Sequence, residues 1–103
     1  MLVPSLPLID EQKIWVFTGP QQSRKSAFPS GVFSTQTGAE NWIAKHELSG
    51  TLTMYRVDIG SYDWAIQNGY FRPTEPHHST PEFIADFSGG DIHFHYESGR
   101  RVP

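Results

Sequence analysis

The sequence contains no cysteine among its 103 residues. This absence excludes a disulfide framework, a thiolate nucleophile and a zinc site built from cysteines. The sequence also lacks an apolar run long enough to cross a bilayer, because the apolar segment 1–9 is short, holds two prolines and has no basic start. We therefore expect an N-terminal tail over residues 1–12, no membrane association and a cytoplasmic protein.

A basic excess is also missing. Eight lysines and arginines stand against eleven aspartates and glutamates, which gives a formal net charge of −3. The basic residues are dispersed apart from the pairs Arg24-Lys25 and Arg100-Arg101, whereas nucleic-acid binding normally requires a basic face. We expect no nucleic-acid partner, and the mild acidity is compatible with docking a basic protein.

Aromatic residues are plentiful, with three tryptophans, seven phenylalanines and four tyrosines. Because each buries a large area, a chain of this length can fill one core without metals or disulfides. We expect a single domain over residues 13–97, followed by a C-terminal tail over residues 98–103.

Five segments have the β-branched, aromatic or alternating composition of strands, and we expect strands at 13–18, 32–34, 51–59, 82–87 and 91–96. The last two flank Ser88-Gly89-Gly90, which predicts a hairpin.

Two helices are also expected. Thr37 and Glu40 have the spacing of a capping box, and one apolar stripe follows along Ala39, Trp42, Ile43 and His46. Ser61 can cap a second, short helix that ends at Asn68-Gly69. The elements follow in the order β-β-α-β-α-β-β. This order predicts an α+β domain, an antiparallel or mixed sheet with two helices on one face.

The sharpest chemical candidate is the sequence His93-Phe94-His95. Alternate residues of a strand share a face, so His93, His95 and Glu97 would project together and could bind zinc or another divalent ion. Such a site needs a further ligand, which His77 or His78 could supply. The alternative is a terminal strand whose polar face meets solvent.

No catalytic motif with the required residue types and spacing is present. The histidines could also serve acid–base chemistry, but no basic groove for a polyanionic substrate is visible. We assign no catalytic residue and no cofactor, and we favour a protein that is not an enzyme.

Aromatic and acidic residues are frequent in the sequence just after Ser61, where the second expected helix begins. Tyrosine and tryptophan dominate protein interfaces, so these residues could bind a protein partner. The candidate partner-binding residues are Tyr62, Asp63, Tyr70, Asp86 and Asp91. The alternative is that these aromatic residues close the core, with Trp64 buried.

Several motifs together resemble a family of small, mostly bacterial domains of unknown function. They are Trp15-Val16-Phe17-Thr18-Gly19, Phe28-Pro29-Ser30-Gly31-Val32-Phe33-Ser34, Ala39-Glu40-x-Trp42-Ile43, Leu48-Ser49-Gly50-Thr51-Leu52-Thr53 and Tyr62-Asp63-Trp64-Ala65. The resemblance covers residues 14–97 and implies no catalytic residues.

In size and lack of a catalytic motif the chain also resembles immunity proteins of interbacterial toxin systems, such as contact-dependent growth inhibition. This likeness implies a non-catalytic protein-binding module that neutralises a cognate toxin domain. The alternative function is a small metal-binding protein or metal-dependent enzyme. A third is an accessory domain that forms homo-oligomers through an exposed strand edge.

Overall fold

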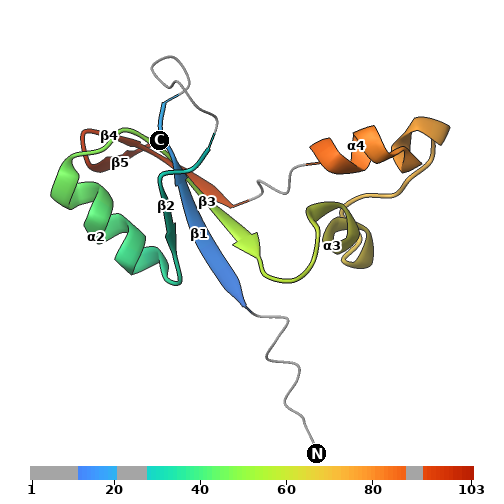
Figure 1. The fold of residues 1–103 in the computed structure, drawn as a ribbon, viewed down its shortest axis with the longest axis horizontal. Coiled ribbons are helices and arrows are strands. Elements are labelled where there is room, and N and C mark those ends of the chain that lie inside the picture. Colours follow the sequence, from blue (N-terminus) through green and yellow to red (C-terminus); the bar gives the residue numbers. More distant parts are fainter. Residues whose placement is uncertain (1–11, 21–27, 88–91) are drawn as a thin grey trace, which may run out of the picture. The chain divides into compact units, whose positions relative to one another are not determined.

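The computed structural model describes residues 12–20, 28–87 and 92–103. The chain divides into two compact units (Figure 1). We call residues 1–57 with 90–103 the sheet unit, and residues 58–89 the helical unit. The expected tail over residues 1–12 lies outside the described residues apart from Gln12.

The sheet unit contains one antiparallel sheet. Its strands are β1 (Lys13–Thr18), β2 (Gly31–Phe33), β3 (Gly50–Arg56), β4 (His93–Glu97) and β5 (Arg100–Val102), in the spatial order β2-β1-β3-β4-β5. Phe17 lies opposite Leu52, which lies opposite Phe94. Because directly opposed residues share a face, this register gathers the large apolar side chains of the central strands on one side of the sheet.

Helix α2 (Gln36–His46) packs its apolar stripe against that side (Figure 1). Fully or almost fully buried residues from α2 and three strands form the core, namely Phe17, Ala39, Ile43, Leu52 and Tyr96. The helix begins two residues earlier than the expected capping box predicts, because its N-cap is not Thr37. Its N-cap is Thr35, whose hydroxyl accepts a hydrogen bond from the Gly38 amide at 3.0 Å.

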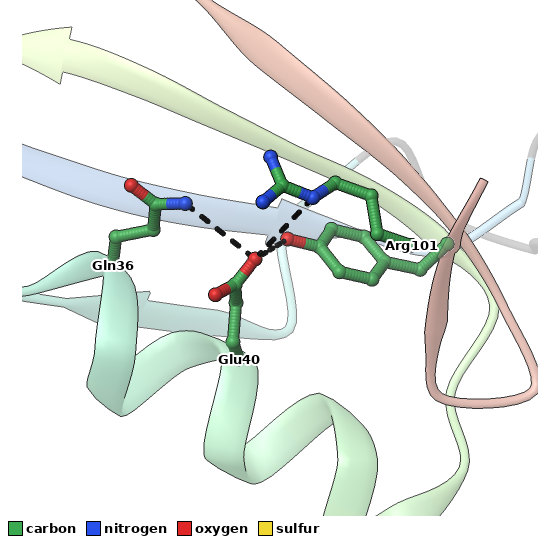
Figure 2. Close-up of polar contacts among 4 residues, drawn as sticks. Gln36, Glu40 and Arg101 are labelled. Carbon is green, nitrogen blue, oxygen red and sulfur yellow. Dashed lines mark hydrogen bonds and ion pairs between the residues drawn. The ribbon is translucent and has the colours of Figure 1, made fainter. Parts of the chain in front are cut away.

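Glu40, the expected partner in that capping box, instead joins α2 to the last two strands (Figure 2). Its Oε2 atom accepts a 2.5 Å hydrogen bond from the Tyr96 hydroxyl and lies 3.8 Å from Arg101 Nε. The Arg101 guanidinium also stacks over the Phe94 ring at 4.1 Å. The edge strand β5 is thereby tied to both the helix and the neighbouring strand.

The C-terminal hairpin differs from the expected one. Residues 82–87 were expected to form a strand, but α4 (Pro81–Asp86) occupies this segment. The Thr80 hydroxyl caps α4 by accepting from the Phe83 amide, and Pro81 occupies the first helical turn, where its fixed φ favours a helix. Ser88-Gly89-Gly90 lies outside the described residues.

The hairpin forms instead between β4 and β5. Its two turn residues, Ser98 and Gly99, have φ values of 51° and 87°, which is the backbone of a type I′ turn. Residues 98–103 were expected to be a tail, but they contain the paired strand β5.

The helical unit contains α3 (Ser61–Gln67), the 3₁₀ helix η2 (Pro76–Ser79) and α4. The order β-β-α-β-α-β-β is confirmed, with η2 and α4 added between α3 and β4. Within the described part of the sheet unit α2 is the one helix, and α3, the second helix expected against the sheet, belongs to the helical unit. None of the described helices is long and apolar enough to traverse a bilayer.

Candidate docking surface of the helical unit

The helical unit has a small interior, since Ala65 is its one buried residue among those described. A cluster of half-buried aromatic rings holds the unit together. Tyr62 projects from α3 and contacts Phe71, Phe83 and Phe87, with ring centroids 5.9, 6.3 and 5.6 Å apart. Phe71 stacks on Phe83 at 5.7 Å and meets Phe87 at 5.1 Å. These edge and offset contacts join α3, the connection after it and α4.

His78 fixes the connection between α3 and α4 through polar contacts. Its Nδ1 atom accepts hydrogen bonds from the Thr74 and Glu75 amides, both at 3.1 Å. Its backbone carbonyl accepts a 2.8 Å hydrogen bond from the Tyr62 hydroxyl. Nδ1 thus provides the acceptor for two backbone amides of the connection.

A shallow groove lies along α4, and we call it the Phe83 groove. It has a volume of about 500 Å³ and is lined by His77, Thr80, Glu82, Phe83, Asp86 and Phe87. Residues four apart on a helix share a face, so Glu82 and Asp86 form an acidic row beside the row of Phe83 and Phe87. Both carboxylates are exposed, while both rings are half-buried.

A second groove of about 430 Å³ begins at Tyr70, which is 75 % exposed. The Tyr70 ring is held in place by parallel stacking on Trp64, with centroids 5.3 Å apart and planes inclined by 10°. Phe71 and Arg72 also line this groove. Phe71 also contacts both phenylalanines of the Phe83 groove, so the aromatic cluster connects residues that line the two grooves.

The negative charge of the chain is concentrated in this unit. Residues 58–89 contain five carboxylates and one arginine, whereas the rest of the chain contains six carboxylates and seven basic residues. The helical unit therefore has a formal charge of −4 and the remainder of +1, so a mild overall acidity conceals a strongly acidic part.

Comparison with known proteins identifies a family. A family profile described as a domain of unknown function, DUF7710, matches residues 14–102. The chain belongs to the DUF7710 family. No curated protein matches the chain, and no solved structure does. The expected resemblance to a family of unknown function is thus confirmed, and the match extends through β5.

The DUF7710 fold places four of the five candidate partner-binding residues in the helical unit. Tyr62 is half-buried in the aromatic cluster, whereas Asp63, Tyr70 and Asp86 are exposed. Asp91 lies outside the described residues. Trp64, which was expected to be buried, is half-buried against Tyr70.

The aromatic row of the Phe83 groove is not predicted from the sequence, because residues 82–87 were expected to form a strand. The signal that identifies a helix there is Thr80-Pro81-Glu82, an N-cap residue followed by proline and an acidic residue in the first turn. The helical assignment puts Glu82 and Asp86 on one face, which a strand of the same sequence would also do. A strand would place Phe83 and Phe87 on the opposite face from these carboxylates, whereas the helix brings the two rows side by side along one groove.

The histidine strand of the DUF7710 domain has the expected alternation. His93, His95 and Glu97 are exposed, while Phe94 and Tyr96 face α2. The two imidazole rings lie 5.1 Å apart, and His95 Nδ1 is 3.2 Å from the Thr51 hydroxyl. Among the residues that the structure describes, no three histidine, aspartate or glutamate side chains lie close enough together to hold a metal ion.

Proposed function

We propose that this DUF7710 domain is a non-catalytic protein-binding module, in the form of a cytoplasmic immunity protein that neutralises a cognate bacterial toxin. The observation that carries the proposal is the surface of the helical unit, where the exposed Tyr70 ring, the half-buried phenylalanines and two grooves coincide with a formal charge of −4. Protein interfaces are enriched in aromatic anchors at their centre and have a polar, solvent-accessible rim.

The division of the chain supports this assignment. In the sheet unit, the face of the sheet that packs on α2 holds the core and the contacts of Glu40 with Tyr96 and Arg101. The helical unit has few buried residues and leaves its side chains available at the surface. A sheet unit that supplies stability and a helical unit that supplies contacts would suit a binder that occludes the active site or the partner surface of a toxin.

The test is co-expression with the toxin domain encoded beside this chain. We expect growth to be rescued, and we expect purified chain and toxin to elute as one complex from a sizing column. A chain of the same length in which Ile43 is replaced by aspartate serves as the unfolded control. Absence of rescue at full expression of a folded chain, together with absence of a complex, would contradict the proposal.

A second candidate function, a metal-binding protein or metal-dependent enzyme, is favoured by one observation. His93 and His95 present two exposed imidazoles on one strand face, with Glu97 two residues further along that face. Two imidazoles are suitable ligands for zinc, and a site would need additional donors. Stoichiometric zinc that survives dialysis, and that disappears in the His93→Ala/His95→Ala variant, would support this function. Protein that loses all zinc on dialysis would exclude it.

A further inference from the structure

The acidic row of α4 lies beside an apolar row. Glu82 and Asp86 are exposed, and both line the same groove as the half-buried rings of Phe83 and Phe87. An occupant of this groove therefore meets an apolar wall and two carboxylates together. This combination suits a peptide segment that carries both apolar and cationic side chains.

The two carboxylates have no counterion within the chain as far as it is described. No ion pair involves Glu82 or Asp86 among the described residues. Glu40 of the sheet unit contrasts with them, because it accepts from Tyr96 and faces Arg101. The carboxylates of the groove can therefore pair with an incoming cationic group without first breaking an ion pair among the described residues.

We propose that the Phe83 groove binds a basic amphipathic segment of the partner protein. This inference rests on the proposed function, and it specifies the partner's chemistry and the surface that meets it. An aliphatic side chain of the segment would pack against Phe83 and Phe87. Lysine or arginine one turn away would reach Glu82 and Asp86, as in helix-in-groove recognition.

Charge complementarity favours a basic protein segment over a second copy of the chain or a nucleic acid. A second copy docking groove to groove would bring two surfaces of charge −4 together, which is unfavourable in a symmetric dimer. A nucleic acid is repelled for the same reason. A basic protein segment gains long-range attraction as well as local ion pairs, so its association is fast and depends on salt.

The probes are two synthetic amphipathic helical peptides. One carries leucine on one face of the helix and lysine on the adjacent face, and the other has glutamate in place of each lysine. Each is titrated into the full chain labelled with ¹⁵N at low salt. We expect the lysine peptide to bind and to shift amide resonances over residues 77–87. We expect the glutamate peptide to leave the spectrum unchanged.

The Glu82→Gln/Asp86→Asn variant removes the two charges while keeping the shape and the aromatic cluster. We expect it to weaken binding of the lysine peptide by about tenfold, as the loss of two exposed ion pairs implies. The matched control is Glu47→Gln/Glu97→Gln, which removes two exposed carboxylates from the sheet unit. We expect its Kd to remain within about twofold of the unmodified chain.

The outcomes separate this inference from the proposed function. Equal weakening in both double variants, shifts confined to other residues or no binding of the lysine peptide would overturn the groove assignment. Shifts over residues 77–87 that appear on concentrating the chain alone would assign the groove to a second copy and overturn it too. A toxin complex that forms equally well with Glu82→Gln/Asp86→Asn would leave the protein-binding function standing and the groove assignment wrong.

Discussion

The Tyr96 hydroxyl donates a 2.5 Å hydrogen bond to Glu40 Oε2, and this bond joins β4 to the middle of α2. Tyr96 is only 4 % exposed. Burial raises the pKa of Tyr96 well above its usual value of 10, and the hydrogen bond and negative charge of Glu40 raise it further. Arg101 acts in the opposite direction and does not outweigh them.

This shift makes stability fall at alkaline pH. Between the pKa of the unfolded tyrosine and the higher pKa of folded Tyr96, the unfolded chain loses a proton that the folded chain keeps. The stabilisation is therefore complete below about pH 10 and decreases above it, by about 1.4 kcal/mol per pH unit. In urea unfolding from pH 8 to 11, we expect the unmodified chain to show this extra slope above about pH 10 and Tyr96→Phe to lack it. Identical slopes in both proteins would contradict it.

Gly50 marks a close approach of two strands. A Cβ atom at this position would collide with the Thr18 carbonyl oxygen and lie 2.7 Å from the Phe17 ring. Because backbone and core would have to move, we expect Gly50→Ala to lower the free energy of unfolding by about 1–3 kcal/mol. Gly19→Ala is the control, since a Cβ there meets nothing within 4 Å. Equal midpoints of urea unfolding for the two variants would refute the close approach.

Ile43 is the largest contribution of α2 to the core and is fully buried. Truncation leaves a cavity between the helix and the sheet, so we expect Ile43→Ala to cost about 2–5 kcal/mol. Val32, which is 61 % exposed on the edge strand β2, provides the comparison. We expect Val32→Thr to change stability by about 0.5 kcal/mol or less, measured by the same unfolding titration. A similar cost for both changes would place the core elsewhere.

The sequence predicted the elements that depend on local patterns. The strand at 13–18 and the stripe of Ala39 and Ile43 were both recognisable, because alternation and helical spacing report the buried face directly. The alternation of the histidine strand was equally visible. Its exposed and buried residues follow the expected faces.

The errors arose where two local signals competed. Ser88-Gly89-Gly90 and Ser98-Gly99 are both turn sequences, and the second joins the paired strands β4 and β5. The short segment 82–87 fits a strand as well as a helix, because periodicity cannot separate a short strand from a helical turn. The Thr80 cap decides between them. The charge asymmetry between the two units could not be recognised until the unit boundaries were known.

His78 is expected to control the local order of the helical unit. Its Nδ1 atom accepts from the Thr74 and Glu75 amides, and its ring packs against both Phe71 and Phe83. Phenylalanine at this position keeps the ring but removes the acceptor, which leaves two backbone donors to water. We expect His78→Phe to cost about 1 kcal/mol and to accelerate hydrogen exchange at both amides.

The neighbouring His77 is the matched control for this change. Its ring lies 4.4 Å from that of His78 and also contacts Phe83, but it caps neither Thr74 nor Glu75. We expect His77→Phe to leave exchange at those two amides within about twofold of the unmodified chain. Equal acceleration in both variants would mean that ring packing, and not acceptance at Nδ1, orders the connection. Acceleration confined to His78→Phe would establish this histidine as the polar anchor that holds η2 and α4 on the aromatic cluster.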